Sequence, residues 1–257
     1  MILAVLQGRM SSTRLPGKVL KPVLGVPMIL RQIERLKRCQ RLDGIVVATS
    51  IEDSDTPIAG ACGEAGVDCV RGSLDDVLGR FVAVIERYQP DHVVRLTADC
   101  PLADWQIIDD LVDLHVRSGA DYTSNALQRT YPVGLDCEVM KADVLLQANA
   151  NATTEFEREH VTPYVYQVPG RFDVQHLTQD EDTSFLRWTV DTPGDFAFAN
   201  AVFEALYPDN PAFDRNDILA FLDSHETVRN LNASSQSEED LGRARAYWKQ
   251  RQLTGNH

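Results

Sequence analysis

Four short runs rich in apolar residues, each followed by a segment with helical spacing, most constrain the fold of this 257-residue chain. The runs cover residues 1–6, 45–49, 67–70 and 92–96. They are too short to span a membrane, and apolar runs of this length are typical of strands buried on both faces of a parallel sheet. The alternation of strand and helix predicts an α/β fold with a mostly parallel central sheet flanked by helices.

Helical spacing is clearest over residues 28–38, where Ile29, Ile33 and Leu36 recur on one face. The polar cluster SIEDSDTP predicts that another helix begins near Pro57. The same spacing predicts further helices over residues 77–88, 105–117, 196–206 and 216–225, and the segment FLRWTVD predicts a strand that ends at Asp191.

The regular alternation loosens between Asp121 and Gln175. Turn signals at Pro132 and Gly134 interrupt short β-prone runs there, which predicts a small inserted lobe over the sheet edge. We therefore expect one domain over residues 1–230, with 121–175 as a lid lobe. A polar helical tail is expected over residues 231–257, with a helix around 241–249.

The loop after the first apolar run has the composition of a polyphosphate cradle. Its glycines let the backbone approach a ligand, its hydroxyls can donate to anionic oxygens, and three cations follow: Arg9, Arg14 and Lys18. The spacing matches neither a P-loop nor a Rossmann glycine motif. A solvated basic turn is the alternative, but open α/β sheets bind ligands just after such strands, which favours the anion site.

Two acids follow predicted strands in similar settings. Asp99 follows RLTA and Asp191 follows RWTV, and a proline is close to each. Two carboxylates can share one Mg²⁺, which prefers oxygen ligands and commonly bridges substrate phosphates. Either Asp alone is more typical of a helix N-cap. Their pairing with the anion cradle favours a metal site.

The net charge of −13 argues against a nucleic-acid partner. A local cluster of cations can still bind a nucleotide, because charges beyond the Debye length of ~8 Å are largely screened. The five cysteines contain no C-x-x-C pair, which argues against a disulfide framework or a zinc site. No signal segment precedes the first run, so we expect a soluble, cytoplasmic protein.

Further polar residues have two interpretations. His160 and Tyr164 lie four residues apart in EHVTPY, where a single histidine is more often structural than ligand-binding. Cys100, beside Asp99, has no base recognisable as its partner and is interpreted as a small buried residue. The same ambiguity applies to the charged residues of RTYPVGLDCE, namely Arg129, Asp136 and Glu138.

Seven segments, in order, resemble the cytidylyltransferases that activate acidic sugars, the acylneuraminate and 3-deoxy-manno-octulosonate (Kdo) family. The likeness is greatest to its spore-coat-polysaccharide branch and runs from the N-terminus to about Asp195. The segments are QGRMSSTRLPGKVL, VVATS, RGSLDDVLGRF, RLTADCPL, RTYPVGLDCEV, REHVTPY and RWTVDTP.

The resemblance implies the Rossmann-like fold of nucleotide-diphospho-sugar transferases and a homodimer. It also implies transfer of CMP from CTP to a sugar acid or related sugar, with Mg²⁺ as cofactor and pyrophosphate as product. At matching positions Asp99 and Asp191 are the metal ligands and, with Arg9 and Lys18, the catalytic residues. The implied nucleotide-binding residues are Arg9, Ser12, Arg14, Lys18, Ala48, Thr49, Arg71 and Ser73, of which Arg71 reads the cytosine edge. The implied sugar-binding residues are Arg129, Asp136, Glu138, His160 and Tyr164.

Two positions depart from the family pattern. Ala98 stands where related sequences usually carry glycine, and Gly194 replaces an acidic residue. Neither change removes an implied ligand. The alternatives are a metal-dependent nucleotide-sugar glycosyltransferase, a nucleotidyltransferase that uses another nucleoside triphosphate, and a non-catalytic nucleotide-binding protein. The basic first loop suits a triphosphate best.

Overall fold

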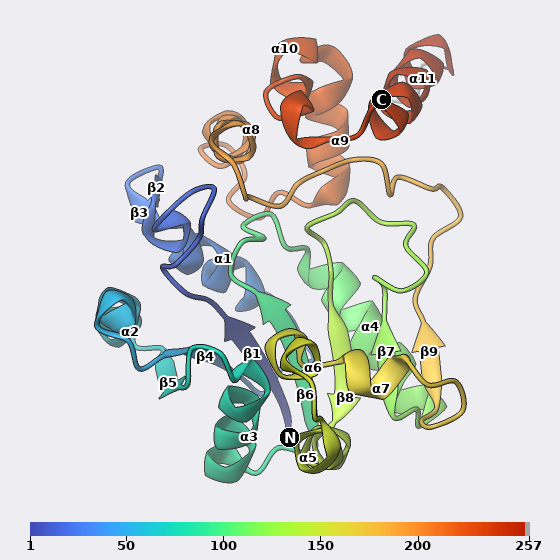
Figure 1. The fold of residues 1–257 in the computed structure, drawn as a ribbon. Coiled ribbons are helices and arrows are strands. Elements are labelled where there is room, and N and C mark those ends of the chain that lie inside the picture. Colours follow the sequence, from blue (N-terminus) through green and yellow to red (C-terminus); the bar gives the residue numbers. More distant parts are fainter. Residues whose placement is uncertain (255–257) are drawn as a thin grey trace.

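The computed structural model describes residues 1–254 and contains a seven-stranded central sheet with helices on both faces (Figure 1). The strand order is β5-β4-β1-β6-β8-β7-β9, and β8 runs antiparallel to both of its neighbours, whereas the other pairs are parallel. The strands are β1 (Ile2–Gln7), β4 (Gly44–Ser50), β5 (Asp68–Gly72), β6 (His92–Thr97), β7 (Tyr122–Ser124), β8 (Glu138–Lys141) and β9 (Val174–His176). A separate hairpin pairs β2 (Pro22–Val23) with β3 (Val26–Pro27).

Side chains alternate along β1 between two apolar cores, one on each face of the sheet. Ala4 and Leu6 pack in the core of Ile33, whereas Leu3 and Val5 pack in the core of Phe81. The first core lies under α1 (Met28–Leu36), α2 (Thr56–Glu64) and α4 (Trp105–Ser118). The second lies under α3 (Val77–Tyr88), α5 (Ala142–Asn151) and α7 (Pro163–Tyr166), whereas α6 (Glu155–His160) packs beside α3 without burying a side chain.

The C-terminal helices pack around a third apolar core, at the top of Figure 1, on the side toward which β1 and β6 point. Trp188, Phe203, Phe213 and Trp248 are buried there. The helices are α8 (Pro193–Leu206), α9 (Arg215–Ser224), α10 (Glu226–Arg229) and α11 (Glu238–Thr254). Three short 3₁₀ turns complete the described chain: η1 (Lys18–Leu20), η2 (Asp53–Asp55) and η3 (Ala233–Ser235).

The predicted fold class is confirmed, and the four apolar runs form β1, β4, β5 and β6. The strand predicted to end at Asp191 is wrong. That segment makes a single isolated bridge, between Val133 and Arg187, and does not join the sheet. Its apolar residues Trp188 and Val190 pack into the C-terminal core instead, which explains why a buried, β-prone sequence lies outside a strand.

The segment predicted as an inserted lobe, residues 121–175, supplies β7, β8 and β9 of the main sheet. Its helices α5, α6 and α7 lie outside the sheet, on the face of α3.

The predicted polar tail packs against the rest of the protein: Trp248 of α11 is 7% exposed, and Arg251 forms an ion pair with Asp223 of α9 at 2.7 Å. The last three residues of that tail lie outside the described part of the chain. No helix within residues 1–254 has the length and apolarity needed to span a membrane.

Candidate active site

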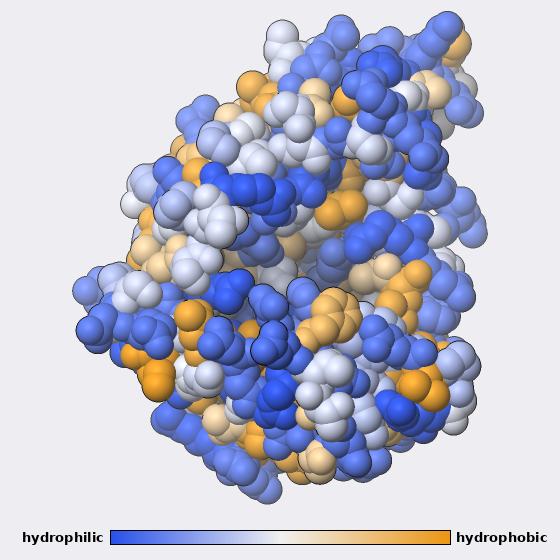
Figure 2. Space-filling view, in the orientation of Figure 1, coloured by the Kyte–Doolittle hydropathy of each residue, from blue (hydrophilic) through white to orange (hydrophobic). Residues whose placement is uncertain are grey.

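A cavity of about 460 Å³ opens at the carboxyl ends of β1 and β6. The chain winds from β1 to β4 and β5 on one side and returns to β6 on the other, so these two strands flank the point where the strand order reverses. Open α/β sheets bind ligands at this point. The surface is hollowed there and bordered largely by hydrophilic residues (Figure 2).

The loop from Gly8 to Lys18 forms one wall of the cavity and is held by its backbone. The Met10 N–H donates to the buried Asp55 carboxylate at 2.7 Å, and the Gly17 N–H donates to the Met10 carbonyl at 3.0 Å. Gly17 has φ +69°, a conformation that glycine adopts without strain. The loop therefore presents Arg9, Arg14 and the hydroxyls between them to the cavity.

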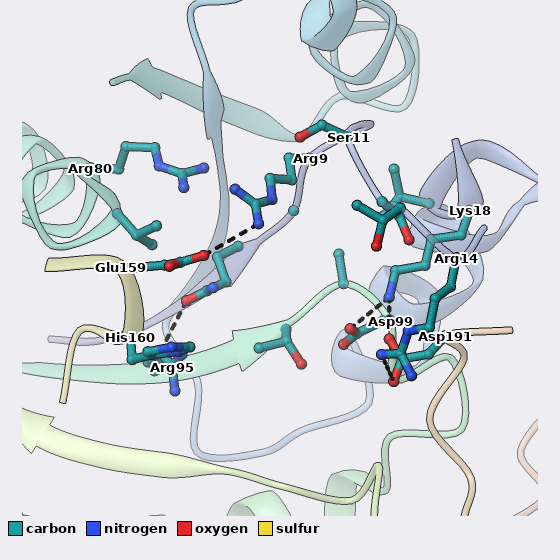
Figure 3. A pocket seen from close by; sticks show the side chains of 18 residues that line it. Arg9, Ser11, Arg14, Lys18, Arg80, Arg95, Asp99, Glu159, His160 and Asp191 are labelled. Atoms are coloured by element: carbon teal, nitrogen blue, oxygen red, sulfur yellow. Dashed lines mark hydrogen bonds and ion pairs between the residues drawn. The ribbon is translucent and has the colours of Figure 1, made fainter. Parts of the chain in front are cut away.

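The Lys18 ammonium lies between the two predicted metal ligands (Figure 3). Lys18 Nζ is 2.9 Å from Asp99 Oδ2 and 2.8 Å from Asp191 Oδ1, and it also donates to the Val190 carbonyl at 2.8 Å. Burial lowers the pKa of Lys18, but the charge of Asp99 and the hydrogen bonds to both carboxylates outweigh burial and raise it above the ordinary value. The ammonium therefore stays charged in the folded protein.

Arg187 forms an ion pair with Asp191 and holds its carboxylate in place. Its Nη2 donates to Asp191 Oδ2 at 2.7 Å, and its Nε donates to the fully buried Asp195 carboxylate at 3.0 Å. Burial raises the pKa of Asp191, but Lys18, Arg187 and Arg14 outweigh it and lower the pKa below its ordinary value. Asp191 is thus held ionised.

Backbone hydrogen bonds fix the spacing of the two acids. The Val190 N–H donates to the Asp99 carbonyl at 2.8 Å, so the segments that carry the acids are joined. Asp195, the third residue of α8, accepts from the backbone N–H groups of Asp191 and Thr192 at 3.0 and 2.9 Å and forms a capping box with Thr192.

The carboxylate oxygens of Asp99 and Asp191 are suitable ligands for Mg²⁺. Mg²⁺ is usually held by one or two carboxylates together with waters and substrate phosphates, not by an all-protein cage. Two carboxylates already share a cation here, the Lys18 ammonium, and residues 1–254 contain no larger group of His, Cys, Asp or Glu able to hold a metal. Asp99 and Asp191 would hold the metal ion.

The opposite end of the cavity carries a second group of charged side chains, which Figure 3 shows apart from Lys18. Arg9 pairs with Glu159 of α6 at 3.4 Å. Arg95 donates to Gln7 at 3.0 Å and forms an ion pair with Glu138. The remaining charged or titratable side chains of this group are Arg80 and His160.

Several of these residues were absent from the sequence predictions. Arg80 and Arg95 lie inside the segments RGSLDDVLGRF and RLTADCPL, and Glu159 directly precedes His160, so the resemblance already contained a signal for them. Arg187 lies in the RWTVDTP segment. The role of Asp55 has no comparable signal, because it depends on a contact with Met10 across the fold.

The other predicted nucleotide-binding residues lie outside the cavity lining, around the ends of β4 and β5. Ala48 and Thr49 are fully buried. The Arg71 guanidinium donates to the carbonyls of Ser50 and Glu52, each at 2.8 Å, and so closes the turn after β4. Ser73 accepts from the Asp76 N–H at 3.3 Å.

Most predicted sugar-binding residues also lie outside the lining, and His160 is the one inside it. Glu138 is 8% exposed and accepts from Thr162 at 2.7 Å, from Tyr122 and from Arg95. Its carboxylate therefore anchors β8 to its neighbours. The rest have protein partners: Arg129 pairs with Asp136, and Tyr164 lies under the Arg171 guanidinium.

Space is tight around both residues that depart from the family pattern, Ala98 and Gly194. A Cβ on Gly8 would approach the Ala98 Cβ to 2.8 Å, so the methyl group of Ala98 fills space that glycine leaves open in the loop. A Cβ on Gly194 would approach the Leu231 carbonyl oxygen to 2.6 Å. Cys100 is 5% exposed and burial raises the pKa of its thiol, as expected for a small buried residue.

This fold and site define a class of protein, an α/β nucleotidyltransferase with a basic, hydroxyl-rich loop after its first strand. A family model described as cytidylyltransferase matches residues 3–243, and the chain therefore belongs to the cytidylyltransferase family, whose members are CTP-using nucleotidyltransferases.

Relatives of similar length support the assignment. The chain is 32% identical over 248 residues to the spore coat polysaccharide biosynthesis protein SpsF of Bacillus subtilis, a match that covers 93% of this chain and 99% of that one. It is 37% identical over 236 residues to an uncharacterized protein of Methanocaldococcus jannaschii, covering 91% and 95%. A cytidylyltransferase structure from Leptospira borgpetersenii superposes with a TM-score of 0.84 at 30% identity, covering 88% of this chain and 95% of that one.

Proposed function

We propose that the protein transfers CMP from CTP to a hydroxyl of a sugar acid or a related sugar and releases pyrophosphate, in the synthesis of a surface polysaccharide or glycoconjugate. The contact that carries the proposal is the Lys18 ammonium between Asp99 and Asp191 at one end of the cavity. The relationship to the spore coat polysaccharide protein supports the polysaccharide context. The homodimer that the family resemblance implies remains a prediction.

The residues of the first loop would hold the triphosphate. Arg9, Arg14 and Lys18 bring three cations to a wall rich in hydroxyls and backbone N–H groups. Charge develops on the leaving pyrophosphate as the bond to the α-phosphorus breaks, and a fixed cation in a partly buried site stabilises it. Lys18, whose side chain is 10% exposed, is the best placed for this role.

Asp99 and Asp191 would bind Mg²⁺ in the complex with CTP. The bound ion would supply positive charge at the α-phosphate and lower the pKa of the attacking hydroxyl. Arg187 and Asp195 would keep the Asp191 carboxylate in place. Positioning of the two substrates for in-line attack then supplies much of the rate enhancement.

The cavity end beside α6 would receive the sugar. His160 lines this end, and Arg95 presents a guanidinium there beside Gln7. A sugar carboxylate would be attracted by this guanidinium. The helices α6 and α7, which lie within the predicted lid of residues 121–175, pack on the same face of the sheet as α3.

The predicted cytosine contact of Arg71 requires a rearrangement, because its guanidinium is already used by the carbonyls of Ser50 and Glu52. Replacing Arg71 with lysine distinguishes the two roles. A cytosine reader would lose discrimination among nucleoside triphosphates, whereas a turn-closing residue would lose stability without a change of preference.

The test is pyrophosphate release from CTP in the presence of Mg²⁺ and a panel of sugar acids and neutral sugars. We expect release with at least one sugar, no activity in Asp99→Asn, and unchanged activity in Asp110→Asn, which alters an exposed acid of α4. Release of free nucleotide from a nucleotide sugar would indicate a glycosyltransferase instead. Near-normal turnover in Asp99→Asn would refute the metal assignment.

A further inference from the structure

The segment from Leu231 to Gln236, which connects α10 to α11, contacts the loop that carries Asp191 from the side away from the cavity. The sequence resemblance ends near Asp195, so nothing in it assigns this segment a role. We infer that Asn232 and Ser235 are positioning residues that hold the Asp191 loop in its active geometry. The inference rests on the proposed function of Asp191.

The Asp191 loop needs such support because the sheet does not provide it. Arg187 makes one isolated bridge, to Val133, and the residues that follow belong to no strand. The Val190 N–H bond to the Asp99 carbonyl holds the loop on the cavity side. Without a ladder of hydrogen bonds, the position of residue 191 depends on individual contacts.

Asn232 supplies the first of these contacts. It is 1% exposed, and its Nδ2 donates to the Arg187 carbonyl at 2.7 Å. Its Oδ1 accepts from Gln236 at 3.2 Å, which fixes the orientation of the amide. Arg187 in turn donates to Asp191 Oδ2 at 2.7 Å, so the chain of contacts runs from Asn232 to the carboxylate.

Ser235 supplies the second contact, on the other side of Asp191. The Ser235 and Thr192 hydroxyl oxygens are 2.8 Å apart and share a hydrogen bond. The Thr192 hydroxyl also donates to Asp195 at 3.0 Å. Asp191 thus lies between two anchor points, residues 187 and 192, and both are held by the same C-terminal segment.

The C-terminal segment packs closely against the Asp191 loop at Gly194, but a cavity separates α11 from residues 186–188. Gly194 leaves room for the Leu231 carbonyl, which a Cβ would approach to 2.6 Å, so a side chain at this position would displace the segment. Between residues 186–188 and α11, by contrast, lies a cavity of about 450 Å³. Trp188 and Val190 still anchor the segment in the C-terminal core, and the hydrogen bonds of Asn232 and Ser235 add restraint at residues 187 and 192, on either side of Asp191.

The test compares three variants. Asn232→Asp replaces the amide donor with a carboxylate that cannot donate to the Arg187 carbonyl, and Ser235→Ala removes the hydroxyl, which Ser235→Thr restores. The control is Ser237→Ala, which removes the contact between Ser237 and Asp240 at the start of α11, 2.7 Å long, without touching the Asp191 loop. Each protein is assayed for CTP-dependent pyrophosphate release and for hydrogen–deuterium exchange in a peptide that covers residues 187–196.

We expect kcat to fall roughly 10- to 100-fold in Asn232→Asp and Ser235→Ala, the scale on which misplaced groups slow catalysis, with a much smaller change in KM for CTP. Exchange at residues 187–196 becomes faster in both, Ser235→Thr restores both readouts, and Ser237→Ala keeps the wild-type kcat. Unchanged kcat and exchange in Ser235→Ala would overturn the inference, as would an equal loss of kcat in Ser237→Ala.

Failure of the proposed function gives a different result. In that case the wild-type protein releases no pyrophosphate from CTP, while exchange at residues 187–196 still reports whether Asn232 and Ser235 hold the loop. If Asn232→Asp does not fold, Ser235→Ala and its threonine counterpart decide the question alone.

Discussion

Replacing Lys18 with methionine should turn the centre of the site from a neutralised cluster into a pair of repelling carboxylates. The ammonium contacts Asp99 at 2.9 Å and Asp191 at 2.8 Å, and methionine fills similar space without charge. Two like charges about 5 Å apart repel by about 3 kcal/mol at an effective dielectric near 20. Arg187 and Arg14 still contact Asp191, so this is an upper value.

The expected result is a free energy of unfolding lowered by up to about 3 kcal/mol, and a Tm lowered by roughly 5–10 °C. Catalysis is lost at the same time. Mg²⁺ without nucleotide should stabilise Lys18→Met more than the wild type, because the two carboxylates then lack the cation that they share in the wild type. Lys21→Met is the matched control, since the Lys21 ammonium lies over the Phe196 ring, 5.5 Å from its centroid, and not between the acids.

The pH dependence of the same variant has a definite sign. In the wild type the pKa of Asp191 is lowered, so its contribution to stability is present above the ordinary value of 3.8 and is lost as pH falls below it. In Lys18→Met the repulsion from Asp99 should raise the pKa of the Asp191 carboxylate. The free energy of unfolding should therefore increase as pH falls from 7 toward 5, because protonation removes the repulsion. Thermal unfolding at several pH values, with and without Mg²⁺, measures both effects. A variant that matches Lys21→Met in Tm, pH response and Mg²⁺ response would refute the reasoning.

Three further predictions concern other parts of the structure. Gly8→Ala should lower the free energy of unfolding by about 1–3 kcal/mol through its clash with Ala98, and Ala98→Gly in the same protein should restore most of it, as a denaturation series will measure. Burial lowers the pKa of His115 from 6.5 to about 4, so acidification across this range should cost up to about 3 kcal/mol of stability, and His115→Gln should flatten the Tm profile between those pH values. Glu159→Gln should leave Tm nearly unchanged, because its ion pair with Arg9 is exposed, yet tighten CTP binding by up to about fivefold in a titration by removing a competing anion.

Much of the fold was predictable because its signals are local. The runs that became β1, β4, β5 and β6 are rich in apolar residues, since both faces of the sheet are covered by helices. The loop from Gly8 to Lys18 was also recognisable, because its composition departs from that of an ordinary turn. Asp99 comes two residues after the end of β6, so its place at the sheet edge could be predicted from the strand alone.

The remaining parts of the site depend on contacts between distant residues. Asp191 was expected at the end of a strand, whereas it is held by Lys18 and Arg187 in a loop outside the sheet. No local pattern distinguishes a free arginine from one whose guanidinium closes a turn, as that of Arg71 does. The hydrogen bond from Asn232 to the Arg187 carbonyl joins residues 45 positions apart, a separation that composition and periodicity do not reveal.

The central claim is that CTP and a divalent metal bind in the cavity at the ends of β1 and β6, with Asp99 and Asp191 as the metal ligands. A crystal structure of the protein with CTP and Mn²⁺ tests this most directly, because the anomalous signal of manganese locates the ion. We expect a manganese peak coordinated by both carboxylates and a triphosphate along residues 9–18. A nucleotide bound elsewhere, or a metal ion that neither carboxylate touches, would contradict it.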